Sequence, residues 1–397
     1  MPRRFALARL TASTLILALA SGAGLAPATA AGSAPVTVGL IYSKTGLLAS
    51  YGAEYAEGFQ VGLDYATHGT GLAGGHKIVV EERDDATDPS KAVAAGKDLI
   101  GQGVHILAGS TSSGVALQMA ALANANKVLF ISGAAATDAI TGLNRYTFRS
   151  GRQTMQDVLT AGTIVGTNLR GKQVLVFAQD FAFGQANVSA VRTVLGSEGA
   201  SVQSVLAPLT TNDFSPFAQK VKDAHPDLLF IAWAGATAGA MWKSLDDQHV
   251  FDTTRVVTGL DLRASYPIFG PVAGKITFLS HYFYRAPHNR VNDALVAALA
   301  KQGKVPDLFD PDGFVAAQMI VHAIEAADGD DPAKTVPALE GWSFSAPKGE
   351  EVVRAADHAL LQPMFVAKLE PAGSGWEPKL LRTIPREAVA PPVRPFK

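Results

Sequence analysis

The sequence predicts an α/β protein of two lobes, each with a parallel central sheet, and three observations lead to this prediction. Short apolar strands alternate with amphipathic helical stretches over most of the chain. This alternation ends near residue 150 and then starts again. About 367 of the 397 residues follow an N-terminal leader, a length that suits two domains of ordinary size. Strand–helix alternation is typical of parallel sheets with helices on both faces.

The first thirty residues have the features of a cleaved signal peptide. Three arginines lie near the start, and residues 10–25 are apolar and uncharged. Ala28-Thr29-Ala30 supplies the small residues that signal peptidase recognises, so cleavage is expected before Ala31. No later stretch is apolar for long enough to cross a bilayer. We therefore expect a soluble protein, exported to the periplasm.

The composition excludes several classes of protein. The chain has no cysteine, which excludes a lipid anchor on cysteine, disulfides, a thiol nucleophile and cysteine metal sites. Its formal net charge is −1, or about −4 without the leader, and no basic cluster is present. Nucleic acid is therefore not an expected partner.

Two strand–helix series can be placed along the chain from the spacing of apolar residues. In the first, strands are expected at 36–42, 77–82, 105–108 and 128–132, and helices at 51–65, 89–100 and 113–124. In the second, strands are expected at 173–178, 201–206, 228–233, 255–259 and 276–279, and helices at 183–195, 214–224 and 237–246.

The C-terminal part has a different pattern. Helices are expected at 291–301, 313–327 and 332–339, and an antiparallel pair of strands at 351–354 and 363–369. Neither group is large enough for a third domain, so we expect the chain to cross back between the lobes. This gives one lobe of 31–151 plus 281–340, another of 152–280 plus 341–385, and a tail of 386–397. The segment after Glu370 is rich in proline and charge and is expected to be peripheral.

Five short blocks occur in order along the chain: Thr45-Gly46 with Ser50-Tyr51-Gly52, then 82–89, 109–113, 131–135 and 361–364. Together they resemble the type I periplasmic binding proteins of the leucine/isoleucine/valine-binding kind. This resemblance implies two Rossmann-like lobes joined by a hinge, which close on one ligand as a Venus-flytrap. It also implies a monomer that serves an ABC permease in the inner membrane and needs no cofactor or metal. In open parallel sheets, ligands bind at the carboxyl ends of the strands, where the blocks lie.

The first lobe offers a site for the carboxylate of a ligand. Ser112-Ser113-Gly114 begins a helix, so free backbone N–H groups and the positive end of the helix dipole are available there. The resemblance places Ser113 at the carboxylate-binding serine, four residues after Gly109, and we include Ser112. The alternative is a helix cap without a ligand.

Three further positions of the first lobe follow from the resemblance. A backbone carbonyl and a threonine hydroxyl meet the ligand in the family. The carbonyl falls on Ala134, whereas Ala136 stands where the threonine is expected and Thr137 comes one residue later. Thr137 could instead cap the turn at Asp138. Tyr51 is the aromatic candidate of this lobe.

The second lobe contributes Phe183, Thr237 and Asp261 by the same resemblance. Phe183 matches an aromatic residue that closes over the ligand, although core packing is the alternative. Thr237 replaces another aromatic residue. Asp261 stands at the position of an acid that binds the ligand ammonium, and its alternative is an ion pair with Arg263. Further possibilities are Tyr42, Lys44, Trp233 and Arg149. A disulfide that the family often carries would join Thr87 and Ser112, so this loop must be held by packing and hydrogen bonds.

Catalytic and metal motifs are not supported. The segment 69–74 fits G-x-G-x-x-G but lies between a helix and a strand, the reverse of a dinucleotide site. Asp84, Asp85 and Asp88 lack calcium-loop spacing, so we expect a solvated turn in which Asp88 caps a helix. The histidines are scattered, and no serine has an identifiable base. An enzyme is therefore not expected.

The expected function is capture of an amino acid or related small carboxylate for an ABC importer. Two alternatives stay open. The cargo could be an aromatic carboxylate or an amide or urea-like solute, which an Asp261 outside the cleft would favour. The chain could also be a sensory subunit that presents its ligand to a signalling receptor.

Overall fold

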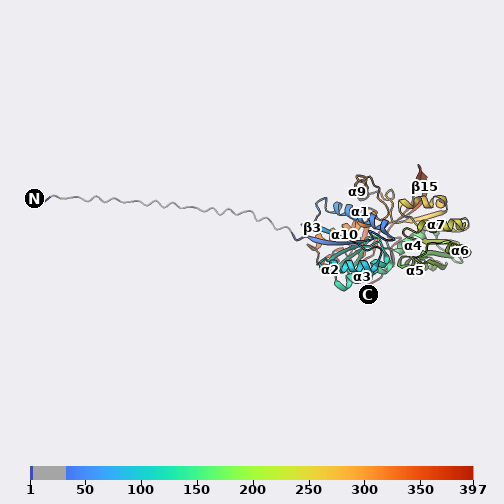
Figure 1. Ribbon diagram of the computed structural model, residues 1–397, viewed down its shortest axis with the longest axis horizontal. Coiled ribbons are helices and arrows are strands. Elements are labelled where there is room, and N and C mark those ends of the chain that lie inside the picture. The colour runs from blue at the N-terminus through green and yellow to red at the C-terminus, as the bar shows by residue number, and fades with distance from the viewer. Residues whose placement is uncertain (3–32, 397) are drawn as a thin grey trace. The chain divides into compact units, whose positions relative to one another are not determined.

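A computed structural model shows an α/β protein with two large sheets and one small sheet (Figure 1). The structure describes residues 1–2 and 33–396, so the predicted signal peptide lies outside the described residues. None of the described helices combines the length and the apolar character that a membrane crossing requires. The two-lobe α/β fold is confirmed.

The first sheet has the strand order β2-β3-β1-β4-β5-β6. Its strands are β1 (Val36–Tyr42), β2 (Leu72–Ala73), β3 (His76–Asp84), β4 (Ile106–Gly109), β5 (Leu129–Ser132) and β6 (Thr147–Arg149). All neighbouring pairs are parallel except β2 with β3. The helices that pack with it are α1 (Ala49–Ala66), α2 (Pro89–Gly101), α3 (Ser113–Asn126), α10 (Asp310–Ala327) and α11 (Pro332–Leu339).

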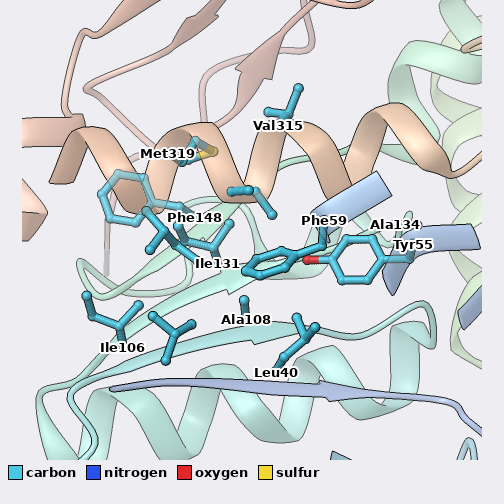
Figure 2. Packing of buried hydrophobic residues seen from close by; sticks show 14 of the residues in the cluster. Leu40, Tyr55, Phe59, Ile106, Ala108, Ile131, Ala134, Phe148, Val315 and Met319 are labelled. Atoms are coloured by element: carbon cyan, nitrogen blue, oxygen red, sulfur yellow. The ribbon is translucent and has the colours of Figure 1, made fainter. Parts of the chain in front are cut away.

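Helices cover both faces of this sheet, which explains its unbroken apolar strands. Leu40, Ala108 and Ile131 face α1 and α10, as Figure 2 shows. Their neighbours in sequence, such as Leu107 and Phe130, face α2 and α3 instead.

Glycines let α1 and α10 approach each other closely. A Cβ atom on Gly58 of α1 would lie 1.9 Å from the carbonyl oxygen of Asp310, and one on Gly313 of α10 would lie 1.9 Å from that of Tyr55. A larger residue at either position would therefore force the helices apart. Helix α9 (Arg290–Ala300) packs beside this pair.

The second sheet has the order β16-β15-β11-β10-β9-β7-β8. Its strands are β7 (Gln173–Gln179), β8 (Ser201–Ala207), β9 (Leu228–Ala232), β10 (Arg255–Gly259), β11 (Ile276–Ser280), β15 (Met364–Ala372) and β16 (Gly375–Ile384). Strands β7 to β11 are parallel, and β15 and β16 are antiparallel to their neighbours.

Helices also cover both faces of the second sheet. On one face lie α4 (Thr154–Val165) and α5 (Ala182–Ser197), and on the other lie α6 (Ser215–Asp223), α7 (Ala238–Asp247) and α8 (Tyr266–Phe269). Short 3-10 helices complete the set: η1 (Asp138–Ile140), η2 (Val250–Asp252), η3 (Arg263–Ser265) and η4 (Gly270–Lys275). The parallel series predicted from the sequence is confirmed for both sheets. Helix α4 and strand β6 were not predicted.

The expected antiparallel pair of 351–354 with 363–369 is wrong. Strand β13 (Gly349–Val353) pairs instead with β12 (Ser343–Ala346) and β14 (Leu360–Leu361) in the small sheet. Strand β15 joins the second sheet. Buried side chains of the small sheet belong to the core cluster of the first sheet. The residues at which the chain passes between the lobes stay a prediction.

The C-terminal segment is more ordered than expected. Strand β16 runs antiparallel to β15 where a peripheral segment was predicted, because the sequence shows little apolar alternation there. The last residues then return to the first sheet's side (Figure 1). Arg394 donates from its backbone to Asp357 at 3.0 Å and from its guanidinium to the carbonyl of Asp138 at 2.8 Å.

The acidic turn before α2 is only partly the solvated cap that we predicted. Asp88 does cap α2, accepting from the N–H of Ser90 at 2.7 Å. Asp85, by contrast, is fully buried. Its two carboxylate oxygens accept from the hydroxyls of Ser43 and Ser110, both at 2.6 Å. It also accepts from the backbone of Thr87 at 2.7 Å, so Asp85 joins the loops that a disulfide often connects in the family.

A buried ionic group lies where the chain crosses between the sheets. Lys348, in the turn between β12 and β13, binds Asp312 of α10 at 2.8 Å, and both side chains are fully inaccessible. His281, just after β11, lies 3.7 Å from the other Asp312 oxygen. Gly151, in the first crossing, leaves room for this carboxylate, since a Cβ atom there would lie 2.6 Å from it. Asp312 thus lies against the first two crossings and is paired with a cation from the small sheet.

This arrangement predicts that Lys348→Met strongly destabilises the fold. The substitution leaves the Asp312 carboxylate buried without its cation, a change that typically costs about 3–5 kcal/mol. Chemical denaturation should show the loss in the free energy of unfolding. The double variant Lys348→Met/Asp312→Asn removes the buried charge as well and should recover part of the loss. Equal stability of Lys348→Met and the wild type would contradict this role for the ion pair.

Candidate functional site

A cavity of about 80 Å³ lies between the carboxyl ends of the two sheets. One ordered water needs roughly 10–15 Å³, so the cavity has room for a small solute. The first sheet and its helices contribute Leu48, Tyr51, Thr111, Ser113, Ala134, Ala136, Leu308 and Phe309. The second contributes Phe181, Phe183, Asn187, Phe230–Ala234, Thr258–Asp261 and Leu279–His281, and Arg152 and Asp157 complete the lining.

Six of the nine predicted ligand-binding residues therefore line one cavity: Tyr51, Ser113, Ala134, Ala136, Phe183 and Asp261. The other three lie beside it. Ser112 caps α3, accepting from the N–H of Val115 at 3.5 Å. Thr137 caps η1, as its alternative reading proposed. Thr237 accepts hydrogen bonds from the indole of Trp233 and the amide of Gln179.

The start of α3 presents polar groups to the cavity. Ser113 is the first residue of this helix and is buried. Its N–H and that of Gly114 belong to the first turn, where no intrahelical partner exists. The Ser113 hydroxyl oxygen accepts from the backbone of Thr137 at 3.2 Å. Its proton stays free to be donated, so the hydroxyl and the helix dipole favour an anion here.

A buried guanidinium shapes the neighbouring segment. Arg149, at the end of β6, donates to the carbonyls of Thr137, Arg152 and Ala135 at 2.7, 2.8 and 3.3 Å. It also donates to the hydroxyl of Thr141 at 3.1 Å. Burial lowers the pKa of Arg149 to about 10, which still leaves it charged at neutral pH. Arg149 is therefore a structural residue of the cavity wall rather than part of the lining.

Tyr51 connects the two lobes across the cavity. Its hydroxyl donates to Asp261 at 2.9 Å and accepts from the N–H of Gly235 at 3.1 Å. Its ring packs on Phe309, with the ring centroids 4.5 Å apart. Burial, followed by the charge of Asp261, raises the pKa of Tyr51 well above its ordinary value, so the hydroxyl stays protonated. The structure is thus a closed one.

The Asp261 carboxylate contacts Tyr51 and does not pair with Arg263. Besides Tyr51, its carboxylate accepts from the N–H of Leu262 at 2.8 Å. Arg263 pairs with Glu377 at 2.9 Å, so the expected alternative of an Asp261–Arg263 ion pair is wrong. Burial raises the pKa of Asp261 above its ordinary value.

Aromatic rings enclose much of the remaining cavity. Phe183 lies near Phe181, with ring centroids 5.9 Å apart. Trp233 also lines the cavity, and its indole is oriented by Thr237. Tyr42 and Lys44, the other residues considered, bind Glu82 instead.

Three titratable lining residues were missed from the sequence: Arg152, Asp157 and His281. Arg152 donates to the carbonyl of Ala134 at 3.0 Å, and its Nε lies 3.3 Å from Asp157. Burial lowers the pKa of His281 well below its ordinary value, and the charge of Arg152 acts in the same direction. The sequence offered a signal for His281, which follows the predicted strand 276–279, whereas Arg152 follows β6, a strand that was not predicted. In the part of the chain that the structure describes, no cluster of His, Asp and Glu is placed to hold a metal ion.

Asp157 should make stability depend on pH. Burial raises its pKa from 3.8 to about 6, although Arg152 opposes this shift. The folded protein therefore binds a proton here more readily than the unfolded chain, and this contribution is lost as pH rises through about 6. Through Asp157 the Tm should rise as pH falls from 7 to 5, whereas buried His281 and His358, whose pKa values are lowered by burial, act in the opposite direction. Asp157→Asn should weaken this dependence, whereas the exposed control Asp246→Asn should not. Identical profiles for Asp157→Asn and the wild type would refute the assignment.

Comparisons with known proteins agree with this architecture. The family model for periplasmic binding proteins matches residues 35–374. The chain is 26% identical to the Leu/Ile/Val-binding protein BraC3 of Rhizobium johnstonii, over 82% of this chain and 88% of that protein. It is 32% identical to an ABC-type branched-chain amino acid transporter from Rhodopseudomonas palustris, with a TM-score of 0.75, covering 91% of this chain and all of that one.

A second solved structure, a solute-binding protein of an ABC transporter from R. palustris in complex with 4-hydroxybenzoate, has a TM-score of 0.80 at 24% identity. It covers 88% of this chain and 97% of that one. These relatives are solute-binding proteins rather than enzymes. With its two lobes, its cleft between strand ends and a family match over most of its length, the chain belongs to the type I periplasmic binding proteins, in the branch of the Leu/Ile/Val-binding components of ABC transporters.

Proposed function

We propose that this protein is the periplasmic component of an ABC importer and captures an amino acid or a related small carboxylate. The observation that carries the proposal is the placement of Ser113 and the start of α3 against a cavity enclosed by both lobes. A carboxylate needs donors when it leaves water, and the free N–H groups and hydroxyl supply them.

An amino acid also carries an ammonium group, which needs acceptors. Asp261 lines the same cavity and carries a carboxylate. Its hydrogen bonds come from Tyr51 and Leu262, and a carboxylate has capacity for about four. An ammonium beside it would offset the cost of burying the charge. Ser113 on one lobe and Asp261 on the other thus suit the two ends of a zwitterion.

An aromatic carboxylate is a second candidate cargo. Six aromatic residues line the cavity: Tyr51, Phe181, Phe183, Phe230, Trp233 and Phe309. Flat aromatic surfaces favour stacking with an aromatic ring of the solute. The carboxylate of such a ligand would use the same start of α3, so the two candidates differ in the group that meets Asp261.

Closure of the two lobes would let the permease distinguish the liganded protein from the unliganded one. A ligand that contacts both lobes stabilises the closed form by its contacts with each of them, which shifts the population from open to closed. We propose that an ABC permease in the inner membrane recognises this closed form. Export by the predicted signal peptide would place the protein in the periplasm. We expect it to act there as a monomer.

A thermal-shift screen of amino acids and aromatic acids should identify the cargo, because a tight ligand raises the Tm by mass action. For any carboxylate found, Ser113→Ala removes one hydrogen bond to a charged group. Such bonds are worth about 1.5–3 kcal/mol, so the Kd should rise about 10- to 100-fold in calorimetry. Ser112→Ala is the matched control: it should lower the Tm through loss of the cap, with little change in Kd. Unchanged affinity in Ser113→Ala would remove this residue from the site.

Tyr51→Phe should weaken the closed form. The variant keeps the ring but leaves the N–H of Gly235 and the carboxylate of Asp261 without the shared hydroxyl. A loss of about 1–3 kcal/mol is typical for a buried partner left unpaired, and affinity should fall about 5- to 100-fold. X-ray scattering of the unliganded variant should show a larger radius of gyration. Tyr42→Phe, which loses a hydroxyl bond within the first lobe, is the control. If both variants behave alike, Tyr51 does not stabilise closure.

A further inference from the structure

The cavity is lined by a cationic side chain, Arg152, that was not among the predicted ligand contacts. Arg152 is the sole lysine or arginine among the described residues that line the cavity. It lies where the chain leaves β6 for α4, between the two sheets. Its side chain is buried, with 9% of the residue exposed. A buried guanidinium is costly unless its donors are satisfied.

The donors of Arg152 are only partly satisfied. Its Nη1 donates to the carbonyl of Ala134 at 3.0 Å. Its Nε lies 3.3 Å from Asp157 but is not aligned for a hydrogen bond, and it has no acceptor among the described residues. A guanidinium has five N–H donors in a planar fork, which matches the two oxygens of a carboxylate.

Asp157 holds the guanidinium in place without exhausting it. The carboxylate lies in the first turn of α4, where the helix dipole stabilises a negative charge. It approaches Arg152 on the Nε side, whereas Ala134 takes one donor at Nη1. Arg149, three residues earlier, has four oxygen acceptors from the protein, so its donors are committed. The contrast separates an arginine that builds the wall from one with donors left for a solute.

Strand order places Arg152 beside the start of α3. The cavity residues follow the ends of neighbouring strands: Ser113 after β4, Ala134 after β5 and Arg152 after β6. Ala134 lies between the other two and is bonded to Arg152. Two donor groups, Ser113 and the Arg152 guanidinium, therefore lie on either side of Ala134 at this edge of the first sheet.

We propose that Arg152 is a specificity-determining residue that binds a carboxylate of the cargo and selects acids over their neutral amides. This inference rests on the proposed function, since it concerns the same cavity. It also decides between the cargo classes left open by the sequence: a carboxylate is favoured and an amide or urea-like solute is disfavoured. An amide would place its NH2 group, a donor, against a guanidinium that can also only donate. One of the two hydrogen bonds made by a carboxylate is then lost, and the two donors repel each other.

The test compares acid and amide partners on the same protein. The pairs are L-leucine with L-leucinamide, L-glutamate with L-glutamine, and benzoate with benzamide. The first and third pairs test a ligand's single carboxylate, and the second tests a side-chain carboxylate. Calorimetry on the wild type, Arg152→Gln and Arg152→Lys gives Kd for each. Arg192→Gln, an exposed arginine on α5, is the control for loss of one positive charge.

Wild-type protein should bind the acid of at least one pair more tightly than its amide. Arg152→Gln keeps a donor for Ala134, and it should weaken the acid about 10- to 100-fold while changing the amide little. Arg152→Lys should restore part of the selectivity, and Arg192→Gln should match the wild type. A purely structural role would weaken acid and amide equally.

Each other outcome is informative. Acid binding that persists in folded Arg152→Gln overturns the role of Arg152 and leaves the proposed function intact. Equal loss of acid and amide affinity in that variant also overturns it. Wild-type protein that prefers the amides overturns both the selectivity and the proposed cargo.

Discussion

The buried pair of Asp312 and Lys348 is the interaction that fixes α10 to the small sheet, next to the first two segments that cross between the large sheets. Two of the crossing segments lie against Asp312, through Gly151 in the first and His281 in the second, and Lys348 of the small sheet supplies its cation. Inside a protein, an ion pair with both partners out of water holds its geometry because loss of either partner is costly. His281 also lines the cavity, so the site and the crossings share a residue. The cavity therefore lies next to the segments about which the lobes would move.

The cavity wall depends on a second buried cation. Arg149 holds the segment 135–141 by bonds to backbone and hydroxyl oxygens, and this segment bonds in turn to Ser113 through Thr137. The polar groups of the first lobe are thus fixed before a ligand arrives, which limits the entropy lost on binding. Across the cavity, the link from Tyr51 to Asp261 already closes the lobes. The protein can reach the closed form through its own contacts, and a ligand would stabilise that form further.

Much of the fold was predictable because most buried strands are apolar and most covering helices have one buried and one exposed face. That pattern gave both parallel series and, with the family blocks, six residues that line one cavity. The failures have physical causes. Strand β12 has only four residues, and β16 is largely exposed and carries little apolar alternation. The pairing of β13 and β15 depends on partners far away in sequence, so local pattern placed them together although they belong to different sheets.

By itself, the sequence determined the α/β class, the two series and the family, since these follow from local periodicity and from short ordered blocks. Only the tertiary structure decided the partners of the charged residues. Asp261 meets Tyr51 rather than nearby Arg263, Asp85 is buried rather than solvated, and Arg152 faces the cavity whereas Arg149 builds its wall. Such choices depend on which segments the fold brings together and on how much water they exclude, and neither quantity can be read from neighbours in the chain.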